Sequence, residues 1–89
     1  MADDAPQALP DIDFATFVLS LGSSALVHLG EAPDEEGQTR ANLSLAKQTI
    51  DLLAMIQSKT KGNLDDGENQ LLSALLYDLR IKYVDARKR

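Results

Sequence analysis

The chain of 89 residues contains no cysteine and no tryptophan, and it has a single histidine. The lack of cysteine excludes disulfides, thiolate metal ligands and a thiol nucleophile. Basic residues are also few, since nine Lys and Arg stand against fourteen Asp and Glu, a formal charge of −5. This balance argues against nucleic-acid binding, which requires a basic face that neutralises many phosphates. We expect no enzymatic activity, metal site or cofactor, because no acid–base–nucleophile set can be assembled.

The chain also lacks a hydrophobic run long enough to span a membrane. Its longest uncharged stretch, residues 14–29, would reach about 24 Å as a helix, less than the roughly 30 Å of a bilayer core. The start of the chain, Met1-Ala2-Asp3-Asp4, is acidic where a signal peptide carries basic residues. We therefore expect a cytoplasmic protein without membrane insertion.

Length and composition indicate one small folded domain, because the apolar fraction of 44% is ordinary for a globular chain. Residues 1–10 hold two prolines and two aspartates, so we expect a disordered acidic arm there. Residues 11–86 then form a single helical domain that contains an exposed acidic linker at 31–41. Residues 87–89 form a basic tail. The charge is unevenly divided, since residues 1–36 carry eight acidic and no basic side chains.

The apolar periodicity predicts an all-α fold of three helices, without strand-like alternation. The helices are expected over about 13–29, 42–61 and 66–86. Gly62 is expected as the C′ residue of the second helix, because glycine adopts the left-handed conformation that ends many helices. The short turn that follows predicts that the second and third helices form an antiparallel hairpin.

The helix ends carry recognisable capping residues. Asp11 or Asp13 is expected as the N-cap of the first helix, and Gly30 as its C′ residue. Asp65 and Glu68 have the spacing of a capping box, with Asp where Ser or Thr is usual. These residues predict where the first helix begins and ends and where the third begins.

The third helix has two apolar stripes on opposite sides. One flank between them carries Ser73 and Arg80. The other flank carries Asp78 and Asp85. A surface helix of a monomer needs only one apolar stripe. The main stripe is Leu71, Leu72, Leu75, Leu76, Leu79 and Tyr83, and the second is Ala74, Tyr77, Ile81 and Val84.

Three helices cannot cover this much apolar surface among themselves, and a large exposed patch usually marks an interaction surface. We expect a helical homo-oligomer, with a dimer as the first candidate, and leave open an additional protein partner. The alternative is a monomer whose acidic arms fold over the patches. The residues expected at helix-packing interfaces are Phe14, Phe17, Leu21, Gly22, Ala25, His28, Tyr77, Ile81 and Val84.

Small residues at 22–25 of the first helix let two backbones approach closely, so they predict a helix crossing. A serine nucleophile at this place would need a base, and the Gly-x-Ser-x-Gly pattern is absent. His28 lies on the apolar arc. It is interpreted as an interface or capping histidine, with a pH switch or half of a dimer metal site as alternatives.

Charged side chains of the second and third helices are interpreted as structural ion pairs. Lys47 and Asp51 are i,i+4 neighbours, and so are Asp78 and Lys82. In an antiparallel hairpin, an Asp51–Arg80 or Lys47–Asp78 pair would also fix the register of the two helices.

Several strings of the sequence occur together in a known family: FATFVLSLGSSA at 14–25, AKQTIDLL at 46–53, KTKGNL at 59–64 and LYDLR at 76–80. With them the chain resembles, over roughly residues 12–84, a bacterial family catalogued as domain of unknown function DUF1844. Asp65-Asp66-Gly67 departs from the family, where Thr followed by acidic residues is typical. The resemblance implies a small cytoplasmic helical protein and brings no activity, cofactor or catalytic residues.

Three hypotheses of function follow. The first is a non-catalytic helical oligomer that acts as an adaptor or scaffold in protein–protein interaction. An alternative is a small-ligand or lipid-binding module, with an apolar slot floored by Gly22 and Ser23. A further alternative is a peripheral RNA- or ribosome-associated factor that uses Arg80, Lys82, Arg87, Lys88 and Arg89.

Overall fold

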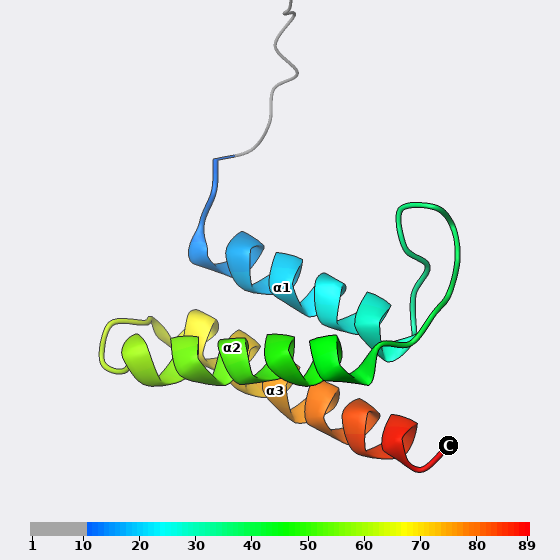
Figure 1. Cartoon of the computed structure of the whole chain (residues 1–89). Coiled ribbons are helices and arrows are strands. Elements are labelled where there is room, and N and C mark those ends of the chain that lie inside the picture. Colours follow the sequence, from blue (N-terminus) through cyan, green and yellow to red (C-terminus); the bar gives the residue numbers. More distant parts are fainter. Residues whose placement is uncertain (1–10) are drawn as a thin grey trace, which may run out of the picture.

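The computed structural model describes residues 11–89, which form three helices and their connecting loops. Each helix packs against the other two (Figure 1). Residues 11–89 contain no strand, so the all-α prediction is confirmed for this part of the chain. The arm expected at residues 1–10 lies outside the described residues. The helices are α1 at Phe14–Leu29, α2 at Leu43–Lys59 and α3 at Asp66–Arg87.

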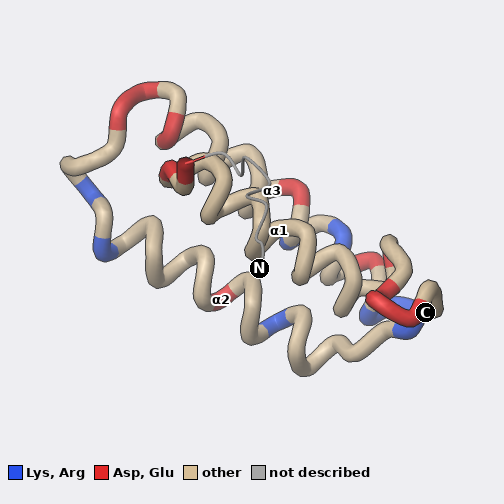
Figure 2. Tube along the Cα trace, turned by 90° about the horizontal axis from the view of Figure 1, so that it is seen from above, with Lys and Arg blue, Asp and Glu red and all other residues tan. Residues whose placement is uncertain are grey.

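The core is aliphatic and is built from all three helices. Within the described residues, no polar or charged residue is buried. Figure 2 shows α1 without a charged residue along its length, in keeping with its packing against both other helices. No helix in residues 11–89 combines the length and the hydropathy that crossing a bilayer requires. The buried side chains are Val18, Ala25, Leu29, Ala46, Ile50, Leu53, Leu72, Leu76, Leu79 and Ala86.

Both ends of α1 follow local capping rules. Asp13, rather than Asp11, is the N-cap, and its Oδ1 accepts a hydrogen bond from the Thr16 amide at 2.8 Å. This hydrogen bonding by Thr16 holds the pKa of Asp13 below its ordinary value of 3.8. At the other end, Gly30 has a left-handed φ of 80°. The Gly30 amide donates to the Val27 carbonyl, and the Glu31 amide donates to the Leu26 carbonyl. These two bonds form a Schellman motif.

The end of α2 differs from the prediction. The helix ends at Lys59, not at 61, and its C-cap is Thr60. The Thr60 hydroxyl donates to the Ile56 carbonyl at 2.7 Å, and the Thr60 amide bonds the same oxygen. Thr60 is therefore the C-cap of α2, and both its amide and its hydroxyl bond the last turn. Gly62, expected at C′, lies instead within the loop, where its φ of 87° turns the chain toward α3.

The predicted capping box at the start of α3 is confirmed. The Glu68 amide donates to Asp65 Oδ1 at 2.7 Å, and the Asp65 amide donates to Glu68 Oε1 at 3.0 Å. Both bonds satisfy backbone donors that a helix start otherwise leaves without partners. Together with the left-handed turn at Gly62, they define where α3 begins next to α2.

The small residues of α1 mark a close crossing, and the partner is α3 of the same chain. A Cβ on Gly22 would lie 2.9 Å from Leu75 Cδ1, closer than side chains normally approach. Leu75 therefore lies directly against Gly22, which was expected at the floor of a ligand slot. Gly22 and Ala25, expected at a helix-packing interface, are buried in the chain's own core.

Candidate protein-interaction surface

The second apolar stripe of α3 is exposed, as the sequence predicted. We call Ala74, Tyr77, Ile81 and Val84 the outer stripe. Tyr77 is 69% exposed, Ile81 44% and Val84 48%, and Ala74 is exposed as well. The main stripe of the same helix contains three fully buried leucines of the core, Leu72, Leu76 and Leu79. α3 therefore has one apolar side that the chain covers and one that it does not.

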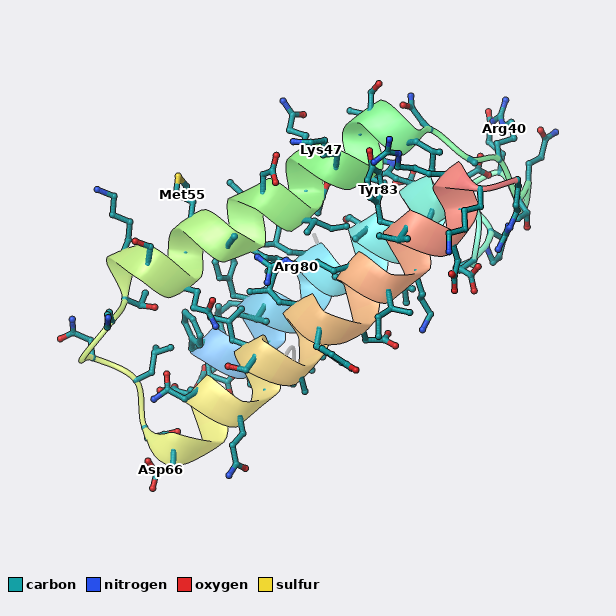
Figure 3. The ribbon with its side chains drawn as sticks, turned by 90° about the horizontal axis from the view of Figure 1, so that it is seen from below. Arg40, Lys47, Met55, Asp66, Arg80 and Tyr83 are labelled. Atoms are coloured by element: carbon teal, nitrogen blue, oxygen red, sulfur yellow. The ribbon has the colours of Figure 1, made fainter. Side chains whose placement is uncertain are left out.

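A groove of about 550 Å³ runs along the outer stripe, and one of its lining residues comes from α2. That residue is Gln57, whose amide nitrogen donates to the Ser73 hydroxyl at 3.3 Å. Figure 3 shows Arg80 in the region between α2 and α3. An elongated, mostly apolar groove on a helical surface is the kind of site that accepts the side chains of another helix. The groove is lined by Gln57, Ser73, Leu76, Tyr77, Arg80, Ile81, Val84 and Asp85.

Charged residues border the outer stripe on both sides. Asp78 pairs with Lys82 one turn along α3, with 2.7 Å between Lys82 Nζ and Asp78 Oδ1. This hydrogen bond raises the pKa of Lys82. Among residues 11–89, neither Arg80 nor Asp85 has an ion-pair partner. Both line the groove, so one cation and one carboxylate border its apolar surface.

The expected ion pairs are formed within helices and not between them. Lys47 Nζ lies 2.7 Å from Asp51 Oδ2 on α2, which raises the pKa of Lys47. The cross-helix pairs of Asp51 with Arg80 and of Lys47 with Asp78 do not occur. The reason is local geometry, since an i,i+4 neighbour is within reach on the same helix surface. Arg80 is therefore a groove residue and does not fix the register of α2 and α3.

Other apolar side chains are also exposed, on α1 and α2. Phe17 is 45% exposed, and Met55 is 50% exposed on the edge of α2 away from α3 (Figure 3). Of the other predicted interface residues on α1, Phe14, Leu21 and His28 are half-buried. The outer stripe differs from these patches because it is continuous along one helix and adjoins a groove. The remaining exposed apolar residues of the helices are Leu19, Leu45 and Leu52.

His28 lies beside the loop that joins α1 to α2. Its carbonyl accepts a hydrogen bond from the Asn42 amide at 2.7 Å. Its side chain lines a cleft that also includes Pro33 and three acidic residues of the loop, Asp34, Glu35 and Glu36. His28 contributes one imidazole to a cleft that is otherwise bordered by acidic side chains, and it packs where α1 meets the loop.

The loop itself was expected as a plain exposed linker, but Asp34 organises it. Asp34 Oδ1 accepts from the amides of Glu36 and Gln38, each at 2.9 Å, and Arg40 donates to Oδ2 at 2.9 Å. The hydrogen bonds from the Gln38 backbone and the Arg40 side chain lower the pKa of Asp34. The same carboxylate raises the pKa of Arg40. In the sequence, this turn is indicated by Asp34, with Gly37 three positions and Arg40 six positions later.

Several basic residues near the C-terminus contact an acidic or aromatic side chain of the same chain. The Arg87 guanidinium lies 5.8 Å from the centre of the Tyr83 ring, a cation–π distance. Arg89 lies 3.5 Å from Glu31 Oε2. Lys82 is paired with Asp78. Of the five basic residues considered for RNA binding, three therefore already have a partner in the chain.

Comparison with known families gives one match. Residues 11–85 match the family model described as Domain of unknown function (DUF1844). No curated protein and no solved structure matches the chain. The groove and the outer stripe are therefore interpreted from their own geometry.

Proposed function

The chain belongs to the DUF1844 family, a domain of unknown function, and from its surface we propose that it acts as a cytoplasmic, non-catalytic helical adaptor that self-associates. The observation that carries the proposal is the exposure of the outer stripe, with Tyr77, Ile81 and Val84 between 44% and 69% exposed. Contiguous apolar surface of this kind on a helical protein typically marks an interface.

The energetic argument for self-association is the burial of these side chains. Removing the exposed half of an Ile or Val side chain from water is worth roughly 1 kcal/mol. Tyr77 adds a larger apolar ring, and its hydroxyl can remain in water at the edge of an interface. The adjoining groove gives a partner helix an apolar surface to enter.

The packing of α2 against α3 holds the outer stripe in a fixed position. We take α2 and α3 as an antiparallel hairpin, since the chain returns through residues 60–65 and places the two helices side by side (Figures 1 and 3). The bond between Gln57 and Ser73 supports this placement next to the groove.

The test is the absolute mass of the whole chain in solution. Light scattering after size exclusion, across a dilution series through the micromolar range, is expected to give a dimer of constant mass. Circular dichroism of the same fractions shows that the helices are formed. A folded monomer at every concentration would overturn the proposal. In that case the outer stripe remains uncovered in solution, and self-association is not its function.

A further inference from the structure

The outer stripe has the spacing of a coiled-coil seam. Its four residues follow one another at intervals of three, four and three positions, which places Ala74 and Ile81 at a and Tyr77 and Val84 at d of a heptad. All four are exposed, and the core lies on another side of the helix. A β-branched residue such as Ile81 at a is typical of two-stranded packing.

The two flanks of this seam carry opposite charge. The e positions are Asp78 and Asp85, and the g positions are Ser73, Arg80 and Arg87. Asp78 is already paired with Lys82 on its own helix. Arg80 and Asp85, which both line the groove, are therefore the charges that border the middle of the seam and have no ion-pair partner among the described residues.

We propose that α3 of a second copy covers the outer stripe in parallel orientation, with Arg80 of each chain paired with Asp85 of the other. This inference rests on the self-association proposed above and specifies its interface. In a parallel pair of helices, a g residue faces the e residue five positions further along the other helix. Arg80 and Asp85 are five positions apart, so the two-fold symmetry of the dimer gives two such pairs.

The same charges disfavour the antiparallel orientation. When two helices run in opposite directions, g residues face g residues and e residues face e residues. Arg80 would then lie near another arginine, and Asp85 near another aspartate. Like charges opposite each other weaken such an interface and select against that orientation. The charge pattern therefore distinguishes between two arrangements that the apolar residues alone would both allow.

The rest of the chain leaves room for this arrangement. α1 meets α3 at Leu75, on the buried side of α3, and α2 meets it at Ser73. A two-fold axis parallel to α3, on the side of the outer stripe, places α1 of the two copies on opposite sides of the dimer. The second helix then contacts α3 and enters the groove beside it.

Charge reversal tests the pairing. Arg80→Asp alone, or Asp85→Arg alone, places like charges at both sites of the dimer. We expect each to raise the dissociation constant at least tenfold at low salt. An equimolar mixture of the two variants restores opposite charges at both sites, and so does the double variant Arg80→Asp/Asp85→Arg, so both are expected to dimerise within threefold of the unmodified chain. Sedimentation equilibrium measures the constants, and native mass spectrometry identifies the mixed dimer.

Lys61→Asp is the matched control for these variants, because it makes the same change of charge at an exposed position of the loop before α3. It is expected to leave the dissociation constant within twofold. If Arg80→Asp weakens the dimer no more than Lys61→Asp does, the pairing with Asp85 is wrong. Failure of the double variant to recover would also overturn it.

Single cysteines test the orientation, since the chain contains no cysteine of its own. In the parallel dimer, residue 74 faces residue 74 of the second copy, and 84 faces 84. Ala74→Cys and Val84→Cys are each expected to form a disulfide-linked dimer alone under mild oxidation. In the antiparallel dimer, 74 faces 84, so only a mixture of the two would cross-link. Ser23→Cys, on the exposed side of α1, is the control for random collision.

The outcomes separate the two proposals. A chain that is monomeric at every concentration overturns self-association and the parallel interface together. A dimer whose dissociation constant is unaffected by Arg80→Asp, or which cross-links only in the mixture of cysteine variants, keeps self-association and overturns the parallel packing of α3. A dimer that responds to charge reversal and cross-links through each cysteine alone supports both.

Discussion

Gly22 of α1 and Leu75 of α3 are packed so closely that the glycine leaves no space for a Cβ. That atom would lie 2.9 Å from Leu75 Cδ1 and 3.0 Å from Cδ2. The contact brings the backbone of α1 against a leucine at the edge of the core. It is the most direct measure in the structure of how tightly α1 and α3 approach each other.

Substitution of Gly22 is therefore expected to act through Leu75. Gly22→Val should lower the free energy of unfolding by about 1–3 kcal/mol, because its methyl groups must displace a packed side chain. Gly22→Ala should cost less, since only the ends of Leu75 must rotate and alanine gains roughly 1 kcal/mol of helix propensity over glycine. Urea unfolding followed by circular dichroism measures both.

Ser23→Val is the matched control, since Ser23 is the exposed neighbour on the same helix. Its effect should stay within about 0.5 kcal/mol. Equal destabilisation by Gly22→Val and Ser23→Val would show that the contact with Leu75 contributes nothing to stability.

A second prediction concerns the core of α2. Leu53 is fully buried, whereas Met55, two residues further on, is half-exposed. Leu53→Ala should lower the free energy of unfolding by about 2–5 kcal/mol, because it removes buried methyl groups and leaves a cavity. Met55→Ala should change it by less than about 0.5 kcal/mol. Similar effects of the two substitutions in chemical denaturation would contradict the burial of Leu53.

The capping box allows a third prediction. Asp65→Ala removes the acceptor of the Glu68 amide and should cost about 1 kcal/mol of stability. Asp65→Ser keeps a side-chain acceptor and should recover most of this loss. Each of the two side chains, Asp65 and Glu68, accepts a hydrogen bond from the backbone amide of the other residue. The effects of Asp65→Ala and Glu68→Ala on stability should therefore not be additive in a double-mutant cycle. If Asp65→Ser is as unstable as Asp65→Ala in thermal unfolding, the cap does not stabilise α3.

The loop at Asp34 is expected to respond to acid. The amide of Gln38 and the side chain of Arg40 hold the pKa of Asp34 below its ordinary value of 3.8. Because this pKa is lower in the folded chain than in the unfolded one, the stabilisation is complete above the ordinary value. It is lost as the pH falls through the lower, folded value.

NMR can follow this transition through the amide shifts of Glu36 and Gln38, whose hydrogens point at the carboxylate. Their titration midpoint should lie below 3.8. In Asp34→Asn the same amides should show no such midpoint, because the amide side chain does not titrate. A midpoint at or above the ordinary value would mean that the loop bonds do not favour the charged form.

The helix ends show how much local sequence determines in this chain. Asp13, Gly30 and the Asp65–Glu68 box were predictable because each acts on backbone groups within four residues. The end of α2 was not, because a glycine in the left-handed conformation marks a turn without fixing which residue before it is the last helical one. The sequence pointed to Gly62 as C′, but α2 ends at Lys59 and Gly62 takes its φ of 87° within the loop.

The exposed outer stripe was predictable in part. The apolar periodicity of α3 distinguishes its buried stripe from its exposed one. This periodicity can be counted from the sequence of α3 alone, without information on the other helices. It could not show which element packs against Gly22, because Leu75 is distant in sequence. The bonds around Asp34 were missed for a similar reason. They depend on the particular path of the loop, and an acidic, glycine-containing stretch is compatible with many paths.

The bond between the Asn42 amide and the His28 carbonyl, 2.7 Å long, draws together the two ends of the loop between α1 and α2. The chain thus leaves the bundle and re-enters it at nearly the same point. Because closing such a loop depends only weakly on its length, the exposed loop residues 35–39 can be replaced by a longer segment without moving either helix. A fluorescent domain or an affinity tag inserted there would project from the bundle and leave the outer stripe of α3 accessible.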